Sequence, residues 1–563
     1  MTNGKAIIEF LLEDRIKLAT VSGIYTTKPA IIEWASQNIP DVDVITTKSY
    51  QVNPNQGNRE PIIAEPEPGS FVNAVGLRNP GMLQGIAELA TLRKKPLRSM
   101  LNVSLSANSI EDFITLARGF SDVADILELN FSCPHVHGYG AAIGSDPNLI
   151  SSYVKAIRPA TEKPIFVKLT PNVENIGQCA RAAVQAGVDG ISAINTHGPI
   201  TYNEINSGKP VLSNQRGGKS GSWIKEIALD AVRQIRQAVG REIPIIGIGG
   251  VSTGEDVANM IAAGANVVGI GSALARVQLK PEYFSALRED ATKGTKKVES
   301  YLLNERLMEY RPHKIIEISE PSKTLRVLTL SGEIKYSGSQ FAYIWIPGAG
   351  EKPFSIALED PLTFVARKKE FDPSKGRGIF TNALFELRKG DIIYVRVVYG
   401  KVPEVCSTKE VRIIAAGTGI ATVPKLAEWL DSNGKEVTVF YGVTKMEEAV
   451  LVDEIGKYAA VYAIEDAGEK ARVLKHILGR APKEVGFYNI GPHEFMHRAM
   501  AIEEQNGANP TNIFSSLETN CMCGIGMCGE CECGGKLLCQ EGTFVSLKYL
   551  QEKGVDIRSY NNE

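Results

Sequence analysis

PIFVKLTPNVENIGQCARAAVQAGVDGISAINT (residues 164–196) begins and ends with short apolar runs that flank an amphipathic helical stretch. The runs are rich in Val, Ile and Leu and lack strict alternation with polar residues, which is typical of strands buried on both faces of a parallel sheet. Nine such runs occur up to about residue 276: ATVSG, VDVITTK, SFVNAVGL, SMLNVSL, ILELNFS, PIFVKL, GISAINT, PIIGIGG and NVVGIGSAL. Eight or so strand–helix units in fewer than about 300 residues fit a (β/α)₈ TIM barrel.

Most of these runs end in a polar residue or a glycine, at the end of the strand where barrel enzymes carry their active sites. Cys133 follows one strand, with Asn130 and Ser132 beside it, so a positioned thiolate could act there as an acid or a base. A buried cysteine without any catalytic role is the alternative. Lys48 and Lys168 end two other strands, and glycine-rich stretches at 217–221, 247–250 and 269–272 could surround a phosphate, as an FMN site requires. Ordinary turns would explain the glycines but not the two lysines.

The composition is that of a soluble globular protein with several domains. The chain has 563 residues, of which 43% are hydrophobic and 22% charged, and this length predicts about three to five domains. A net charge of −2 offers no basic surface for nucleic acid, so we expect no such partner. The first residues lack the features of a signal peptide, and no apolar stretch is long and uninterrupted enough to span a membrane. We therefore expect a cytoplasmic protein.

The pattern changes after the expected barrel. Residues 280–308 are charged and helix-prone, whereas 311–405 alternate apolar and polar residues, which predicts a small antiparallel β-barrel. Strand-like runs then alternate with helices, as in a doubly wound α/β unit. The predicted domains are a TIM barrel at 1–297, a linker at 298–309, a β-barrel at 310–407, an α/β domain at 408–510 and a cysteine-rich domain at 511–563.

Six of the nine cysteines lie between residues 521 and 539. Cys523, Cys528 and Cys531 have the C-x4-C-x2-C spacing of plant-type [2Fe–2S] ligands, and Cys539 can supply the fourth thiolate. A zinc knuckle is the alternative, but zinc usually requires two separated cysteine pairs. We expect Cys521 and Cys533 to be spare thiols, although Cys533 could compete with Cys539.

Two stretches of the α/β unit are candidates for binding a dinucleotide. Residues 415–424 (AAGTGIATVP) follow a strand and open a helix, so Gly417, Thr418 and Gly419 would face a pyrophosphate. Gly491 and Pro492 end the last strand of the unit, where a nicotinamide would lie. Glu465 and Asp466 could bind a ribose hydroxyl and would repel a 2′-phosphate, which favours NAD over NADP. A solvated loop is an equally good interpretation of these two acidic residues.

The β-barrel and the α/β unit together resemble ferredoxin-reductase-like modules. KPFS (352–355) and GIFT (378–381) precede the glycine-rich turn in the order found in that family. The resemblance implies that these two stretches bind FAD, through Lys352, Pro353, Phe354, Ser355, Gly378 and Thr381.

The first 300 residues resemble the catalytic subunit of dihydroorotate dehydrogenase. The resemblance rests on TTKS, NAVGLRNPG, LNFSCP, VKLTPN, INT, GGKSG and IGG, in that order. From residue 310 onward the chain is similar to the electron-transfer subunit of the NAD-linked (type B) enzyme, through YRPHKIIEI, GSQFAYIWIPG, EKPFSIA, AAGTGIA and ETNCMCGIGMCGEC. These subunits are normally separate chains, so this chain resembles a fusion of the two.

The resemblance implies a function and a set of site residues. Cys133 would remove the C5 proton of dihydroorotate while C6 delivers hydride to FMN, and Lys48 would lie between flavin and substrate. Asn73, Asn130, Ser132, Asn195 and Thr196 would hold the pyrimidine ring, and the amides at Val75, Gly76 and Leu77 would receive its carboxylate. FMN would be bound by Ser22, Lys48, Lys168, Ser220, Gly221, Gly249, Gly250, Gly271 and Ser272.

The same resemblance implies that electrons pass from FMN through a [2Fe–2S] cluster to FAD and then to NAD⁺, in the oxidation of dihydroorotate to orotate for pyrimidine biosynthesis. It also implies a homodimer formed through the TIM barrel. The chain departs from the family at His135, where Asn is usual after the Cys-Pro pair, and at Ile490, where Cys is usual.

Two alternatives remain open. SCPH and FVKLTPNV also resemble the FMN barrel of dihydropyrimidine dehydrogenase, which acts on uracil or thymine. Uncharged uracil would not require the turn at residues 75–77, and the extra four-iron ferredoxin segments of that family are missing here. The other alternative is an NADH-dependent reductase with another acceptor, or a binding or electron-carrier protein whose barrel has lost catalysis. The complete set of Lys48, Asn73, Asn130, Cys133 and Asn195 argues against such a loss.

Overall fold

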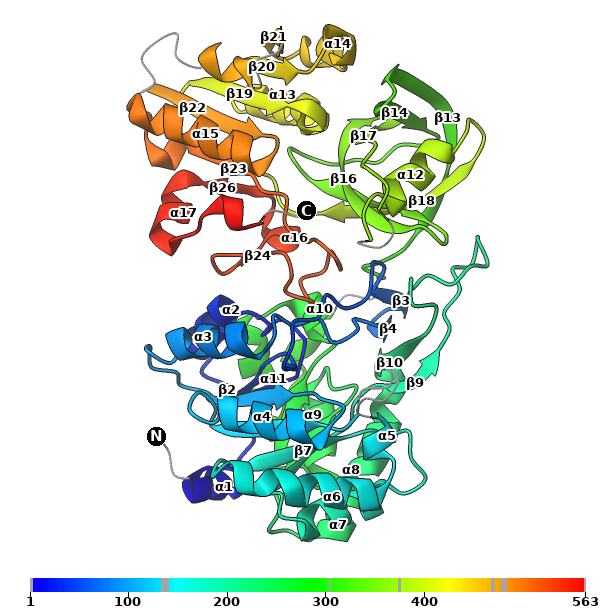
Figure 1. Ribbon diagram of the computed structural model, residues 1–563, viewed down its shortest axis with the longest axis vertical. Helices are drawn as coiled ribbons and strands as arrows, with labels where there is room; N and C mark the ends of the chain where they lie inside the picture. The colour runs from blue at the N-terminus through cyan, green and yellow to red at the C-terminus, as the bar shows by residue number, and fades with distance from the viewer. Residues whose placement is uncertain are drawn as a thin grey trace. The chain divides into compact units, whose positions relative to one another are not determined.

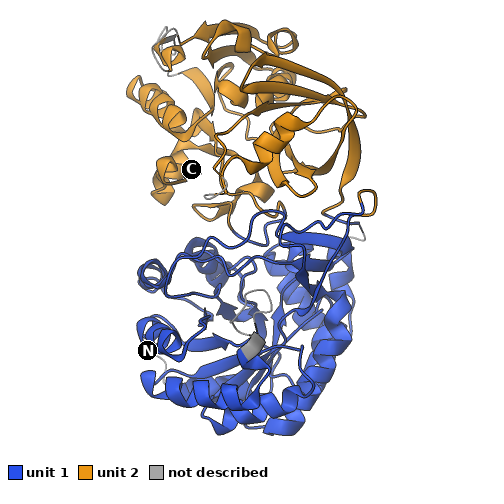
Figure 2. Cartoon of the chain, turned by 45° about the vertical axis from the view of Figure 1, so that its right-hand side comes forward, with its two compact units in different colours: residues 1–204, 208–307, 525–529 blue, residues 205–207, 308–524, 530–563 orange. Residues whose placement is uncertain are grey.

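The structure is a computed structural model that describes residues 4–132, 141–302, 305–372, 376–466, 471–476 and 484–560. The chain divides into two compact units, coloured separately in Figure 2. Unit 1 comprises residues 1–204, 208–307 and 525–529, and unit 2 comprises residues 205–207, 308–524 and 530–563.

Unit 1 contains a closed barrel of eight parallel strands, which confirms the predicted TIM barrel. The strands are β1 (Leu18–Thr20), β2 (Val42–Thr46), β5 (Met100–Leu105), β6 (Ile126–Asn130), β7 (Ile165–Leu169), β8 (Gly190–Ala193), β11 (Ile245–Ile248) and β12 (Val267–Ile270). They are ordered β1-β12-β11-β8-β7-β6-β5-β2, and β1 also pairs with β2, so no strand edge is left open.

Helices surround these strands in Figure 1. They are α1 (Gly4–Leu12), α2 (Pro29–Asn38), α3 (Met82–Leu92), α4 (Ile110–Phe120), α5 (Ala141–Gly144), α6 (Pro147–Ile157), α7 (Ile176–Gln185), α8 (Lys225–Val239), α9 (Gly254–Ala262), α10 (Leu274–Val277) and α11 (Pro281–Lys293). Helix α7 shows how the sequence dictates them. Asn175 caps its first turn by accepting a hydrogen bond from the Gln178 amide, and its buried residues, such as Ile176, Cys179 and Ala183, share one face.

One of the nine apolar runs does not belong to the barrel. The run SFVNAVGL contains β4 (Ser70–Asn73), which pairs antiparallel with β3 (Ile63–Glu67) and β10 (Gly217–Gly221). Together with β9 (His197–Ile200) these strands form a separate sheet in the order β3-β4-β10-β9. Phe71 and Val72 are both fully buried. The run therefore lacks polar alternation for the same reason as a parallel barrel strand, and the pattern alone cannot distinguish the two.

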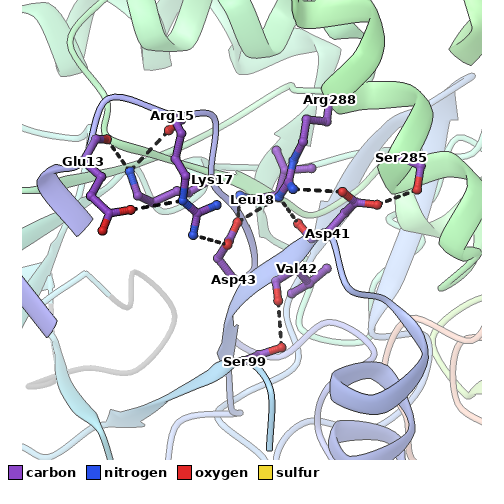
Figure 3. A network of polar contacts seen from close by, with 10 residues as sticks. All are labelled: Glu13, Arg15, Lys17, Leu18, Asp41, Val42, Asp43, Ser99, Ser285 and Arg288. Carbon is purple, nitrogen blue, oxygen red and sulfur yellow. Dashed lines mark hydrogen bonds and ion pairs between the residues drawn. The ribbon is translucent and has the colours of Figure 1, made fainter. Parts of the chain in front are cut away.

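An ion-pair network fixes the strands of unit 1 at the starts of β1 and β2 (Figure 3). Asp43 of β2 accepts hydrogen bonds from the Leu18 amide at 3.0 Å, from Arg15 at 2.8 Å and from Arg288 of α11 at 3.0 Å. Arg288 also pairs with Asp41 at 2.9 Å. These contacts hold the two strands and the last long helix of the barrel in one arrangement.

Unit 2 begins with a second closed barrel, formed by β13 (Arg311–Ser322), β14 (Leu325–Leu330), β15 (Phe341–Ile346), β16 (Gly350–Glu359), β17 (Leu362–Arg367) and β18 (Ile392–Tyr399). Its order is β13-β14-β17-β16-β15-β18, all neighbours are antiparallel, and β13 closes it by pairing with β18. The predicted antiparallel barrel is therefore confirmed. Helix α12 (Ile379–Glu386) also packs here, with Phe380 in the barrel core.

The rest of unit 2 is an α/β unit. Its sheet contains β19 (Glu410–Ala416), β20 (Glu436–Val443), β21 (Ala460–Glu465), β22 (Val485–Ile490), β23 (Ile513–Ser516) and β26 (Phe544–Ser546), in the order β21-β20-β19-β22-β23-β26. Only β26 is antiparallel to its neighbour. The sheet thus extends beyond residue 510, and the boundary that we placed there remains a prediction.

The helices of this part are α13 (Val423–Ser432), α14 (Val452–Ile455), α15 (His493–Gln505), α16 (Leu538–Glu541) and α17 (Leu547–Lys553). A short hairpin, β24 (Glu532–Cys533) and β25 (Lys536–Leu537), lies in the cysteine-rich segment. Among the described residues, no helix is both long and apolar enough to cross a membrane.

We expect Phe166→Ala to destabilise unit 1. Phe166 is fully buried in an apolar layer with Ile7 and Leu11 of α1 and with the inner residues of several strands. Its truncation leaves a cavity and should cost about 3–5 kcal/mol. The unfolding transition of the barrel should therefore move to lower denaturant concentration. Leu83→Ala, at a position 79% exposed, should change stability by less than about 0.5 kcal/mol. Equal effects of the two substitutions would contradict this assignment of the core.

Candidate functional site

A chain of hydrogen bonds connects polar side chains at the carboxyl ends of the barrel strands. Asn130, the last residue of β6, donates from Nδ2 to Ser49 Oγ at 3.0 Å and accepts from Ser132 Oγ at 2.7 Å. Ser132 Oγ accepts from Asn195 Nδ2 at 2.7 Å, and Ser49 Oγ lies 3.3 Å from Ser22 Oγ. Four residues singled out from the sequence thus belong to one connected set. Asn195 is further fixed because its Oδ1 accepts from the Thr196 amide at 2.8 Å.

Both predicted lysines are buried beside this set. Lys48 follows β2 and is 6% exposed, and Lys168 lies in β7 and is 5% exposed. Lys168 is the register partner of Asn130 in the β6–β7 ladder. The two ammonium groups place positive charge near the carboxyl ends of the barrel strands, which suits an anionic or strongly polar ligand.

Sequence analysis missed Glu128, whose carboxylate lies inside the barrel. Glu128 is 1% exposed, and its Oε2 accepts from Ser192 Oγ at 2.7 Å and from Asn102 Nδ2 at 3.3 Å. Its Oε1 has no hydrogen-bond partner among the described residues. The sequence does contain a sign of this residue's role, because Glu128 interrupts the otherwise apolar run ILELN. A carboxylate in a buried strand rarely occurs without a polar partner.

The turn at residues 75–77 directs backbone amides away from its asparagine neighbours. The carbonyl of Val75 accepts from the Asn58 amide at 2.9 Å, and that of Gly76 accepts from Asn55 Nδ2 at 3.1 Å. A trans peptide directs its C=O and N–H to opposite sides, so the amides of Gly76 and Leu77 point away from these asparagines. Gly76 and Leu77 have φ values of +79° and +56°, and successive backbone amides in a turn can form a concavity that binds an anion.

Glycine backbones meet where a phosphate would bind. A Cβ on Gly221 would lie 2.0 Å from the Gly69 carbonyl, and one on Gly250 would lie 3.0 Å from the Gly221 carbonyl. Gly221 ends β10, and Gly250 follows β11. Gly271 and Ser272 follow the neighbouring strand β12, so the glycines gather after the last two strands of the barrel, where TIM-barrel enzymes commonly bind phosphate. No side chain larger than hydrogen fits at Gly221, because its backbone packs against the Gly69 carbonyl. The glycines that follow β11 and β12 are compatible with the predicted phosphate site of FMN.

The remaining predicted residues of this site differ in how far they can be placed. Asn73 ends β4 and is paired with Gly218 of β10, and Ser220 is paired with Phe71 in the same ladder. Cys133 and His135 lie outside the described residues, so the proposed base and the family-divergent histidine have no structural account here.

In unit 2 the two predicted FAD stretches lie together. Phe354 of β16 and Phe380 of α12 have ring centroids 5.9 Å apart. Gly378 caps α12 with a φ of +68°, and Thr381 Oγ1 accepts from the Lys369 amide at 3.2 Å. Lys352, Pro353 and Ser355 are on β16 with Phe354. The two stretches therefore form one surface of the antiparallel barrel.

The two predicted NAD stretches also meet. A Cβ on Gly419 would lie 2.8 Å from Ile490 Cγ2, and one on Gly491 would lie 3.1 Å from Ala416 Cβ. Gly417, with φ of +56°, and Thr418 begin the 3₁₀ helix Gly417–Thr422, and Pro492 precedes α15. This helix is joined to the FAD stretch, because Thr422 Oγ1 donates to Ser355 Oγ at 2.9 Å. The arrangement places the two pairs of predicted dinucleotide-binding stretches next to each other within unit 2.

A buried acid lies beneath the NAD stretch. Glu503 of α15 is fully buried, and its carboxyl group accepts a hydrogen bond from Asn489 Nδ2 at 2.9 Å. Asn489 directly precedes Ile490. The Oε1 atom of Glu503 has no partner among the described residues. Burial raises the pKa of Glu503 from 4.5 to about 8, so the carboxyl group is largely protonated at neutral pH.

Four cysteines of unit 2 lie together. Cys521 and Cys539 are hydrogen-bonded to Cys531, with the Sγ atoms of Cys531 and Cys539 3.2 Å apart, and these contacts lower the pKa of the Cys531 thiol. Cys523 is hydrogen-bonded to Cys539. Cys521, expected to be a spare thiol, is thus part of this group. Cys533 is hydrogen-bonded instead to Tyr560, and burial raises its pKa to about 11.

Cys528 belongs to unit 1 with the rest of residues 525–529. Within that unit the Tyr25 amide donates to the Met527 carbonyl at 2.8 Å, and Thr27 Oγ1 donates to the Cys528 carbonyl at 3.2 Å.

Thiolates are the ligands that a [2Fe–2S] cluster requires, so the cysteine-rich segment is chemically suited to the predicted cluster. No group of three or more His, Cys, Asp or Glu side chains in the described part of the chain is arranged to hold a metal ion. Gly524 and Gly526, with φ values of +79° and +77°, give the intervening loop left-handed turns in which amides can face sulfur.

Comparison with known proteins assigns the first half of the chain to a family. Residues 14–286 match the family described as dihydroorotate dehydrogenase. A relative from Methanocaldococcus jannaschii, the catalytic subunit of dihydroorotate dehydrogenase B (NAD(+)), is 42% identical over 40% of this chain and 74% of its own length. Catalytic subunits of the same name from Pyrococcus abyssi and Alkaliphilus metalliredigens are 40% and 39% identical, over 83% and 82% of their lengths and 46% and 45% of this chain.

The raised pKa of Glu503 predicts a pH-dependent stability. Between 4.5 and about 8 the folded protein keeps a proton that the unfolded chain releases, so unit 2 should lose stability as pH rises through this range. Glu503→Gln removes this titration. Its stability relative to the unsubstituted protein should therefore increase from pH 5.5 to 8, by up to about 1.4 kcal/mol per pH unit.

Thermal unfolding across this pH range would measure the effect, with the exposed neighbour substitution Glu504→Gln as the control. A stability difference that does not change with pH for Glu503→Gln would contradict the buried, protonated state.

Proposed function

The chain belongs to the dihydroorotate dehydrogenase family, and from this we propose that it oxidises dihydroorotate to orotate and transfers the electrons to NAD⁺. The observation that carries the proposal is the connected set of Asn130, Ser132 and Asn195 at the carboxyl ends of the barrel strands. The amide turn at residues 75–77 supports the same substrate, because dihydroorotate carries a carboxylate on its pyrimidine ring.

The connected set suits recognition of a pyrimidine ring. Amide side chains offer both a donor and an acceptor, which match the C=O and N–H groups of such a ring. The hydrogen bonds among Asn130, Ser132 and Asn195 fix the orientation of each amide before substrate binds. Asn73 and Thr196 would complete the ring contacts, and the amides at Val75, Gly76 and Leu77 would receive the carboxylate.

Oxidation requires removal of a proton from C5 and a hydride from C6, with formation of the C5=C6 double bond. We assign the proton to the Cys133 thiolate, a general base of the kind that contributes about 10²–10⁴-fold to a rate. FMN, when bound, is the hydride acceptor. Lys48 and Lys168 would place positive charge beside the flavin, with Ser22, Gly249, Gly271 and Ser272 among its other contacts.

The second half of the chain would deliver the electrons to NAD⁺. We propose that Cys523, Cys528, Cys531 and Cys539 hold a [2Fe–2S] cluster, that the 352–355 and 378–381 stretches hold FAD, and that the 417–419 and 491–492 stretches hold NAD. An iron–sulfur cluster transfers one electron at a time, whereas a flavin can exchange one or two electrons. A flavin next to the cluster could therefore collect two electrons and pass them as hydride to a nicotinamide. The contact between Ser355 and Thr422 supports close placement of the last two sites.

Substrate competition tests this proposal against a neutral dihydropyrimidine. With NAD⁺ as acceptor, we expect kcat/KM for dihydroorotate to exceed that for dihydrouracil by about 10²-fold or more, because hydrogen bonds to a charged group contribute about 1.5–3 kcal/mol each. The appearance of NADH measures both rates. A preference for dihydrouracil would contradict the proposal and favour a dihydropyrimidine dehydrogenase.

Cys133→Ser should separate the two halves of the reaction. Flavin reduction by dihydroorotate should fall by about 10²–10⁴-fold, since a serine hydroxyl is a far weaker base than a thiolate. NADH-driven reduction of an artificial dye should remain within about twofold, because it does not use this base. Cys179→Ser, at a buried cysteine of α7 that has no proposed role, serves as the matched control and should leave both activities intact. Equal loss of both activities in Cys133→Ser would argue against a base at this position.

A further inference from the structure

Tyr343 has a buried hydroxyl group that finds no acceptor among the described residues. It is on β15 of the antiparallel barrel and is fully buried. Among the described residues, it is the only tyrosine whose buried hydroxyl lacks a hydrogen-bond partner. Other buried tyrosines of unit 2 are satisfied: Tyr336 donates to the Ile356 carbonyl at 2.8 Å, and Tyr441 donates to the Glu448 carbonyl at 3.1 Å. An unsatisfied buried hydroxyl destabilises the folded state, so its presence calls for an acceptor.

The hydroxyl end of the Tyr343 ring faces the cysteine-rich loop. A Cβ built on Gly524 would lie 2.8 Å from Tyr343 Cε2, a ring atom adjacent to the carbon that carries the hydroxyl. Gly524 directly follows Cys523. A tyrosine hydroxyl is protonated at neutral pH and can therefore act as a hydrogen-bond donor.

Arg396 holds the ring in this position. Its Cζ atom lies 3.7 Å from the centroid of the Tyr343 ring, and its Nη1 donates to the Cys523 carbonyl at 3.1 Å. The guanidinium is itself fixed by two hydrogen bonds to Glu351, at 2.8 and 2.9 Å. Glu351 also accepts from the Tyr310 hydroxyl at 2.6 Å. Arg396 therefore contacts both the ring and the cysteine loop, while its ion pair with Glu351 keeps the guanidinium in place.

We propose that the Tyr343 hydroxyl donates a hydrogen bond to a sulfur of the iron–sulfur cluster and thereby raises the reduction potential of the cluster, with Arg396 as the residue that positions the ring. This inference rests on the proposed function, since it requires the cluster. Reduction adds negative charge to the cluster sulfurs, so a donor stabilises the reduced state more than the oxidised state. The unpartnered hydroxyl is thereby explained, because its acceptor is part of the bound group.

Tyr343→Phe tests the proposal, because it removes one oxygen atom and keeps the ring under Arg396. The cluster of the intact protein is titrated under anaerobic conditions, and its reduced form is followed by electron paramagnetic resonance. We expect the ratio of reduced to oxidised cluster at a fixed potential to fall by about tenfold, equivalent to about 59 mV for one electron. Tyr336→Phe, which removes a buried hydroxyl of the same barrel that donates to a backbone carbonyl, should leave the potential unchanged.

The outcomes separate this inference from the proposed function. The signal of the reduced cluster differs from that of a flavin radical and comes only from molecules that hold a cluster, so partial loss of iron does not prevent the measurement. An unchanged potential in Tyr343→Phe would overturn the inference, and so would complete loss of the cluster in a folded variant, because a tuning hydrogen bond is not required for binding. An unsubstituted protein without iron and sulfide would instead overturn the proposed function itself.

Discussion

The pairing of β1 with β12 closes the barrel of unit 1, and the site depends on that closure. Leu18, Ala19 and Thr20 pair in register with Val268, Gly269 and Ile270. All eight strands are parallel, so closure brings the carboxyl ends of distant segments to one face. Residues as far apart in sequence as Ser22 and Asn195 can then be joined through one chain of hydrogen bonds. The strand ladder supplies rigidity, and the polar residues after each strand supply the chemistry.

Unit 2 uses a different constraint, a buried ion pair. Arg396 and Glu351 are 0% and 1% exposed, on two strands of the antiparallel barrel. Burial of two charges is costly and adds little stability by itself. The pair instead fixes the guanidinium against the Cys523 carbonyl and the Tyr343 ring. The buried charges thereby hold the cysteine loop in position.

The sequence predicted the strands that are buried along their whole length, because burial leaves a continuous apolar run. Eight apolar runs are barrel strands, and Asn130, Ser132 and Asn195 meet as expected from their places after these strands. The prediction that the run containing β4 is a barrel strand was wrong. Phe71 and Val72 are both buried although β4 belongs to an antiparallel sheet, so the run has the pattern of a parallel strand. Glu128, Tyr343 and the placement of Cys521 could not be predicted, since their roles depend on contacts between segments far apart in the sequence.

The proposed function requires that one polypeptide carry both a dihydroorotate-oxidising barrel and its own route to NAD⁺. Cofactor analysis of the purified protein tests this most directly, by counting released flavins, iron and acid-labile sulfide per chain. The account predicts one FMN, one FAD and two irons with two sulfides, the composition of a [2Fe–2S] cluster. A single flavin per chain, or zinc in place of iron, would contradict it.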